Sequence, residues 1–178
     1  MTEIEFQAWP KTPRLNKPVV FTEKIDGTNG AIHVTEDLEV GAQSRNRLIT
    51  PQNDNYGFAG WVQEHAEDLA SMLGPGIHYG EWWGHGIQRG YGLPKGDRRF
   101  SLFNVNRYGG ISRGDFGLGV VPFLGRSGGG FGRADRVLRD LLATGSEAAP
   151  GYMNPEGIIA YHTASGQVYK YFPTDLSL

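Results

Sequence analysis

The sequence predicts an α+β fold of antiparallel sheets flanked by a few helices, and three observations carry this prediction. The 178 residues are 39% hydrophobic and 12% aromatic, which suits one globular domain with a core of its own. Most apolar segments are short, as strands are, whereas only two reach helical length and spacing. No strand–helix–strand rhythm recurs along the chain. We therefore expect residues 1–178 to form a single domain.

The chain is expected to begin with an extended segment and to continue into short strands. Pro10, Pro13 and Pro18 block helix formation in residues 1–20. Eight later segments are apolar or alternating and are bounded by turn residues, which is typical of strands. These segments are residues 21–25, 31–34, 38–43, 77–83, 99–105, 118–124, 157–161 and 167–172. The first two are expected to pair as a hairpin through a tight turn.

Two longer segments predict helices. In residues 58–73 apolar side chains recur at helical spacing, and Gly74-Pro75-Gly76 ends the pattern. Residues 133–143 carry a second apolar stripe that includes Val137, Leu138 and Leu141. The glycine-rich residues 108–132 between them are expected to form in part a mobile loop.

Several kinds of protein are excluded by what the sequence lacks. It has no cysteine, which rules out disulfides and thiolate metal sites. No run approaches the roughly 20 apolar residues of a membrane helix. The acidic N-terminus also lacks the apolar run of a signal peptide. We therefore expect a soluble, cytoplasmic monomer without a membrane partner, and a phage-encoded origin is one open possibility.

Positive charge is concentrated in the middle of the chain. Residues 89–139 carry ten basic and three acidic residues, although the whole chain has a net charge of −2. Such a basic segment is typical of a nucleic-acid site, and a scattered, solvated surface explains it equally well. The candidate contacts to nucleic acid are Gln88, Arg89, Arg126 and Arg133. Trp82 and Trp83 are either surfaces on which bases stack or core residues.

Lys24 stands at the end of an expected strand, in the run Glu23-Lys24-Ile25-Asp26-Gly27. A lysine acts as a nucleophile only where burial or nearby cations lower its pKa. The period of two along a strand places Lys24 and Asp26 on one face. Taken alone, the run favours an ordinary ion-paired lysine over a nucleophile.

Later segments change this interpretation. The run from Glu23 to Gly30 resembles the nucleophile motif of covalent nucleotidyltransferases, the superfamily of DNA ligases, RNA ligases and mRNA capping enzymes. Its Gly27-Thr28-Asn29 ending looks like RNA ligases of the RNA ligase 2 and RNA-editing type. Five further segments resemble the remaining motifs in order. They are Ser44-Arg45, Gly80-Glu81-Trp82-Trp83-Gly84, Arg99 to Val105, Pro155-Glu156-Gly157-Ile158-Ile159 and Val168-Tyr169-Lys170.

The resemblance implies a role for one residue in each motif. Arg45 is expected to contact the nucleotide, Glu81 to hold its ribose and Lys170 to contact the α-phosphate. An aromatic residue is expected to stack on adenine; Phe100 and Phe103 are both candidates, and Phe103 aligns better. The other residues expected to bind the nucleotide are Glu23, Asp26, Gly27 and Asn29.

The resemblance also implies a fold, cofactors and an activity. The fold is a nucleotidyltransferase (ATP-grasp-like) domain. ATP would donate AMP, and Mg²⁺ or Mn²⁺ would bind Glu156 and Glu81, because Mg²⁺ prefers oxygen ligands. Lys24 would form lysyl-AMP and pass AMP to the 5′-phosphate of an RNA end, single or in a nicked duplex, which a 3′-hydroxyl then seals.

Two groups of alternatives remain at this stage. A small DNA ligase acting on DNA ends, or a GTP-dependent capping-type enzyme, would use the same Lys24. A nucleic-acid-binding or regulatory module of the same fold would have lost the activity. The sequence departs from the family in two ways that bear on this choice. The fifth motif has one lysine instead of two, since Val168 and Phe172 flank Lys170 at a spacing of two. We also expect no C-terminal OB or helical domain.

Overall fold

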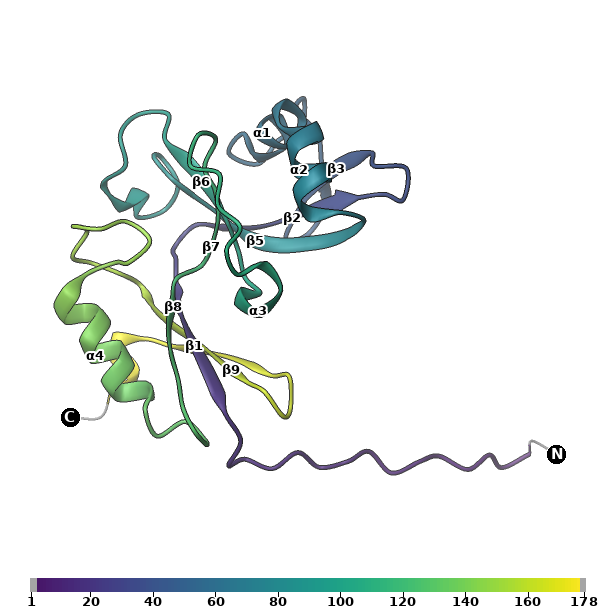
Figure 1. Ribbon diagram of the computed structural model, residues 1–178, viewed down its shortest axis with the longest axis vertical. Coiled ribbons are helices and arrows are strands. Elements are labelled where there is room, and N and C mark those ends of the chain that lie inside the picture. Colours follow the sequence, from purple (N-terminus) through teal and green to yellow (C-terminus); the bar gives the residue numbers. More distant parts are fainter. Residues whose placement is uncertain (1–2, 177–178) are drawn as a thin grey trace.

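The computed structural model describes residues 3–176 as two β-sheets with helices packed against them (Figure 1). The strands are β1 (Val19–Lys24), β2 (Thr28–Val34), β3 (Val40–Ser44), β4 (Leu48–Ile49), β5 (Gly76–Gly84), β6 (Arg98–Leu102), β7 (Leu118–Val120), β8 (Phe123–Arg126), β9 (Gly157–His162) and β10 (Val168–Tyr171). The helices are α1 (Phe58–Glu64), α2 (Ala66–Leu73), α3 (Val105–Tyr108) and α4 (Ala134–Thr144), with 3₁₀ turns η1 (Gly90–Gly92) and η2 (Pro173–Asp175). The predicted α+β class with antiparallel sheets is confirmed: among the named strands, only the β6–β7 pair is parallel.

The smaller sheet has the strand order β10-β9-β1-β8. Val19 and Phe21 of β1 point to one face, where they pack against Leu138 and Leu141 of α4. The intervening residues of β1 point to the opposite face because side chains alternate along a strand. α4 therefore covers one face of this sheet and leaves the Lys24 face for the site (Figure 1). None of the helices within residues 3–176 has the length and apolar character needed to span a bilayer.

The larger sheet has the strand order β4-β3-β2-β5-β6-β7 and carries its own core. The Phe58 ring of α1 lies 4.9 Å from the ring of Phe100 and 5.4 Å from that of Trp82, measured between centroids. Burial of such aromatic side chains is among the strongest contributions to a core. The helix pair α1–α2 thus closes one face of the sheet (Figure 1) and leaves the Glu81 side facing the smaller sheet.

The predicted hairpin between residues 21–25 and 31–34 is wrong. β1 pairs with β8 and β9, whereas β2 pairs with β3 and β5 in the other sheet. The chain crosses between the sheets at residues 25–27, where Ile25 is buried against Trp83 and Tyr91. This crossing depends on contacts with distant residues, so local turn chemistry could not predict it.

Two further elements are divided in the structure. The helix expected at 58–73 breaks at His65, which has φ −109° and ψ 20° and whose ring stacks on Phe116 at 4.4 Å. The strand expected at 118–124 becomes β7 and β8, which belong to different sheets. The carbonyl of Pro122, between them, accepts a hydrogen bond from the backbone N–H of Glu23. Both divisions come from tertiary contacts that override the local pattern.

The extended segment predicted for residues 1–20 is confirmed over residues 3–14, whereas residues 1–2 lie outside the described part of the chain and Val19 and Val20 already belong to β1. From residue 3 to residue 14 the backbone has no regular structure and projects from the body of the molecule (Figure 1). The prolines prevent helix formation here. The side chains of Ile4, Phe6 and Trp9 are at least 90% exposed. The folded part of the chain therefore begins where Val19 enters β1.

Candidate active site

A pocket of about 760 Å³ lies between the two sheets. It brings together six residues singled out in the sequence, whereas Glu156 is not among its lining residues. Those that line it are Glu23, Lys24, Asn29, Glu81, Phe103 and Lys170. Five of them lie in the strands β1, β2, β5 and β10, and Phe103 follows β6, so the fold assembles the pocket from distant parts of the chain.

Lys24 ends β1 and forms the main ion pair of the pocket. Its Nζ lies 2.5 Å from Oε2 of Glu156, and the two side chains are 19% and 17% exposed. Glu156 immediately precedes Gly157, which is the register partner of Lys24 in the β1–β9 pair. The Nζ atom also lies 5.7 Å from the centre of the Phe172 ring, within the range of a cation–π contact. The β1–β9 register therefore delivers the carboxylate to the lysine.

Glu81 reaches the pocket from β5. It is 8% exposed, and its Oε1 accepts a hydrogen bond of 3.0 Å from the backbone N–H of Gly27. Burial raises the pKa of Glu81 to about 7, and the nearby carboxylates of Glu156 and Asp26 add to this, while Lys24 and the Gly27 N–H oppose it. The pocket thus holds a carboxyl group that titrates near neutral pH.

The raised pKa of Glu81 predicts a pH-dependent stability. The folded state binds the proton more tightly than the unfolded state, in which the pKa is about 4.5. Stability therefore falls as the pH rises from 4.5 to about 7, and the cost of about 3 kcal/mol is complete above pH 7. Glu81→Gln keeps an acceptor for the Gly27 N–H but carries no charge. Urea unfolding in the presence of a chelator should therefore show the variant gaining on the wild type between pH 4.5 and 7.5; a constant difference would contradict this.

Glu23 has both carboxylate oxygens engaged by a loop. Oε1 accepts from Ser146 Oγ at 2.6 Å, and Oε2 accepts from the backbone N–H groups of Glu147 and Ala148 at 2.8 and 3.0 Å. Burial raises the pKa of Glu23, and these hydrogen bonds oppose the rise. The Glu23 carboxylate, which is predicted to bind the nucleotide, accepts these hydrogen bonds from the loop that leads to Glu156.

The turn after Lys24 is held by its surroundings. Asp26 Oδ2 lies 3.2 Å from Nε of Arg89, and the Asp26 N–H donates to the Tyr91 hydroxyl at 2.8 Å. A Cβ atom on Gly27 would lie 2.3 Å from the carbonyl oxygen of Trp82. Only glycine fits at this position, because real Cβ atoms essentially never approach so closely.

The aromatic residue and the two cations of the later motifs have different surroundings. Phe100 is fully buried in the core, whereas Phe103 is 39% exposed and lines the pocket. Of the two, Phe103 is thus the one available to a base. Lys170 lines the pocket from β10. Arg45 is exposed in the turn between β3 and β4 and is not among the residues that line the pocket.

The four candidate contacts to nucleic acid form two separate pairs. Gln88 and Arg89 lie near Asp26, just past the end of β1. Arg126 is the register partner of Val20 near the start of β1, and its carbonyl accepts from Arg133 Nη1 at 2.9 Å. The structure therefore does not gather the four residues into one patch. Trp82 and Trp83 are both buried core residues, so neither offers a stacking surface for bases.

Several pocket residues were not predicted from the sequence. They are Val20, Thr22, Ile25, Asn104, Val105, Asn106, Arg107, Ile159, Tyr161 and Val168. Those on β1, β9 and β10 follow the alternation that starts from Lys24 and Lys170, so the period of two could have found them. Those near α3 follow no periodic signal, because the strand expected at residues 99–105 overlaps this one-turn helix only at Val105.

Glu156 and Glu81 fit a metal ion that a nucleotide helps to hold. Within residues 3–176, no group of three or more acidic or histidine side chains is placed to bind a metal. Mg²⁺ keeps several waters and is usually bound by one or two carboxylates together with substrate phosphates. Two carboxylates around one lysine, open to a pocket of nucleotide size, match this pattern.

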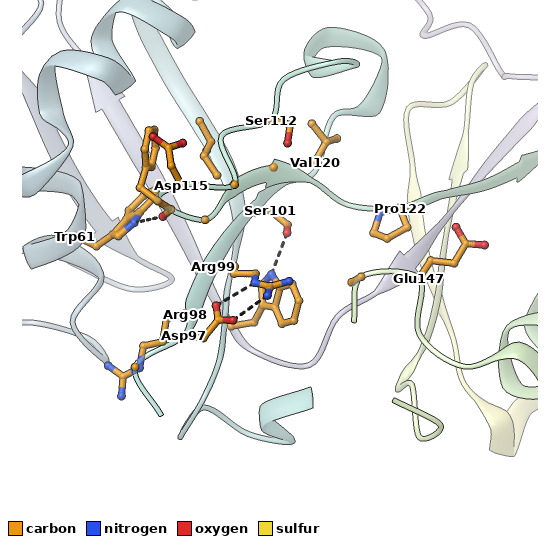
Figure 2. Close-up of a pocket in the computed structure, with 18 residues that line it drawn as sticks. Trp61, Asp97, Arg98, Arg99, Ser101, Ser112, Asp115, Val120, Pro122 and Glu147 are labelled. Atoms are coloured by element: carbon orange, nitrogen blue, oxygen red, sulfur yellow. Dashed lines mark hydrogen bonds and ion pairs between the residues drawn. The ribbon is translucent and has the colours of Figure 1, made fainter. Parts of the chain in front are cut away.

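A second pocket of about 700 Å³ lies along β6 and β7 (Figure 2). Figure 2 shows the guanidinium of Arg99 turned toward Asp97, to which it donates two hydrogen bonds of 3.0 and 2.8 Å. Arg98 donates to the backbone carbonyls of His85 and Tyr56. Its arginines are thus engaged within the protein, and neither Lys24 nor Glu156 lines it. The candidate functional site is therefore the pocket between the sheets, which Lys24 lines.

The two sheets face each other across a pocket lined by Lys24 and Glu81, and Glu156 pairs with the lysine. The family model described as RNA ligase matches residues 17–170. The chain therefore belongs to the RNA ligase family. No curated protein matches it.

The solved structures that resemble the chain include several of an RNA ligase from Naegleria gruberi. The ligase with PPi has a TM-score of 0.60 at 19% identity and covers 89% of this chain and 50% of that one. A variant with AMP and Mn has a TM-score of 0.58 at 17% identity and covers 90% and 51%. At such identities the likeness concerns the fold. The chain spans about half the length of these ligases.

Proposed function

We propose that this chain is the adenylylating domain of an ATP-dependent RNA ligase. The observation that carries the proposal is the position of Lys24, at the end of β1 and paired with Glu156 in a pocket of nucleotide size. The family match and the likeness to a ligase solved with AMP and Mn support the same assignment.

In the first step Lys24 takes AMP from ATP. The unprotonated Nζ attacks the α-phosphorus, an N–P bond forms, and the P–O bond to pyrophosphate breaks. Negative charge grows on the phosphoryl oxygens, and Lys170, which lines the same pocket, would stabilise it. A divalent metal held by Glu156 and Glu81 would supply further positive charge at these oxygens. Phe103 would stack on the base, and it lines the pocket together with the apolar residues Val20 and Ile159.

In the second step AMP is transferred from Lys24 to the RNA end, and in the third step it leaves as the strand is sealed. An oxygen of the 5′-phosphate attacks the phosphorus of lysyl-AMP, which releases Lys24 and caps the RNA end with AMP. A 3′-hydroxyl then attacks the 5′-phosphorus, forms the phosphodiester and expels AMP. The covalent intermediate divides one difficult reaction into easier ones.

Labelling with α-labelled nucleotide tests this proposal. The protein is incubated with Mg²⁺ or Mn²⁺ and either ATP or GTP, and acid-labile label on the chain is measured after denaturing electrophoresis. We expect label from ATP and little from GTP. Label from GTP alone would point to a capping-type enzyme, and no label from either would point to an inactive module of the same fold.

Sealing assays then identify the substrate. Nicked RNA duplex, nicked DNA and single-stranded RNA, each with a 5′-phosphate, are compared with the labelled protein as the AMP donor. We expect AMP transfer to RNA ends and sealing of RNA in preference to DNA. Preferential transfer to nicked DNA would favour a small DNA ligase.

A further inference from the structure

Arg89 joins the turn that follows the nucleophile to the loop that precedes Glu156. Its Nε lies 3.2 Å from Asp26 Oδ2, and its Nη1 donates to the backbone carbonyl of Asn154 at 3.2 Å. Asp26 lies two residues after Lys24, and Asn154 lies two residues before Glu156. One guanidinium therefore spans the two segments that carry the partners of the central ion pair.

Tyr91, on the same segment, makes a second link between these two parts of the chain. Its hydroxyl accepts from the Asp26 N–H at 2.8 Å, and its ring packs on Tyr152 with centroids 4.7 Å apart. The residue is buried, with a left-handed backbone at φ 52° and ψ 25°. Non-glycine residues adopt this conformation only where the surroundings hold them. The segment is thus a built part of the site and not an open loop.

The other end of the same loop is attached to the residue before the nucleophile. Glu23 accepts the hydrogen bonds from Ser146, Glu147 and Ala148 described above. The loop from residue 146 to residue 154 is therefore held at its start by Glu23 and at its end by Arg89. Both attachments lead back to residues that flank Lys24.

We propose that Arg89 is a positioning residue for lysine adenylylation, which fixes the Glu156 segment relative to Lys24; this rests on the proposed function. The side chains of Arg89 and Asp26 are 35% and 25% exposed, so the pair adds little to global stability. The position of Glu156 relative to Lys24 affects the reaction rate much more, since a displacement of about 1 Å at a reacting group costs roughly 100-fold in rate. The expected effect of losing Arg89 is thus kinetic.

The test compares Arg89→Ala and Arg89→Lys with Arg136→Ala, an arginine of α4 whose side chain is 79% exposed. Single-turnover adenylylation is measured as a function of ATP concentration. We expect Arg89→Ala to lower the maximal rate about 10- to 100-fold with the half-saturating ATP concentration changed by less than about twofold. Arg89→Lys should fall between, because one ammonium cannot reach both partners in the same way. Arg136→Ala should match the wild type.

A second measurement does not depend on activity. Hydrogen exchange of residues 150–157 should be about tenfold faster in Arg89→Ala than in the wild type, while α1 and α4 exchange at unchanged rates. Unchanged exchange in this segment would overturn the proposal, even if the wild type fails to label. A variant with normal adenylylation and weakened binding to RNA would instead make Arg89 a nucleic-acid contact, as the sequence suggested.

Discussion

Replacing Lys24 with alanine is expected to abolish the AMP label, with a loss of at least about 1000-fold in the rate of adenylylation. Lys170 also lines the pocket, but it comes from β10, and within the described residues 3–176 the ion pair of Glu156 is made with Lys24. Lys24→Arg is the sharper variant. It keeps a cation beside Glu156, but a guanidinium is not deprotonated in proteins and cannot attack phosphorus. Both variants should therefore fail to label.

The controls separate the loss of a nucleophile from the loss of structure. Lys95→Ala removes an exposed lysine of the β5–β6 connection and should label like the wild type. Lys170→Ala should label slowly, because it removes a stabilising charge and leaves the attacking atom. Thermal unfolding of each variant checks the fold. Label that survives in Lys24→Ala would assign the nucleophile to another residue.

Gly27→Ala is expected to give the second-largest effect, on stability and activity together. The added Cβ would meet the Trp82 carbonyl oxygen at 2.3 Å and Cβ of Trp83 at 2.7 Å, and neither is the end of a flexible chain. Such overpacking costs about 1–3 kcal/mol of unfolding free energy. Relief of the clash would move the backbone N–H of Gly27, which donates a hydrogen bond to Glu81, and with it the turn after Lys24. We expect adenylylation to slow at least tenfold, as one such misplacement can do.

Gly41→Ala is the matched control. Gly41 lies in β3 of the same larger sheet, and a Cβ there would have no atom within 4 Å. Its urea unfolding midpoint and labelling rate should stay close to those of the wild type. If the two alanine variants were equally stable, the close approach at Gly27 would not be what constrains the turn.

The sequence predicted most elements because their signals are local. The alternation of β1 and β9 and the apolar stripe of α4 lie within a few residues of chain. The crossing between sheets at Ile25 is set instead by burial against Trp83 and Tyr91. The residues around Gly27 carry no local signal of these contacts, so the sequence predicted a hairpin between residues 21–25 and 31–34.

The site shows the same division. The order of motifs identified Lys24, Glu81, Glu156 and Lys170, and the structure brings these four residues together. The sequence could not show that the Glu23 carboxylate is engaged by a loop more than 120 residues away. Alignment favoured Phe103 over Phe100, and the structure adds that Phe100 is buried in the core whereas Phe103 lines the pocket. The direction in which a side chain points depends on what packs behind it, and that is a property of the whole fold.

The pocket also lies between two hydrophobic cores, one under α4 and one under α1 and α2. A ligand that contacts both Lys24 and Glu81 would therefore link the smaller sheet to the larger one. A free ligand concentration of 100 times the dissociation constant adds about 2.7 kcal/mol to the free energy of unfolding. In the proposed adenylylated form the AMP is bound covalently to Lys24. The folded state would therefore become more stable when Lys24 is adenylylated and less stable when AMP is transferred to RNA.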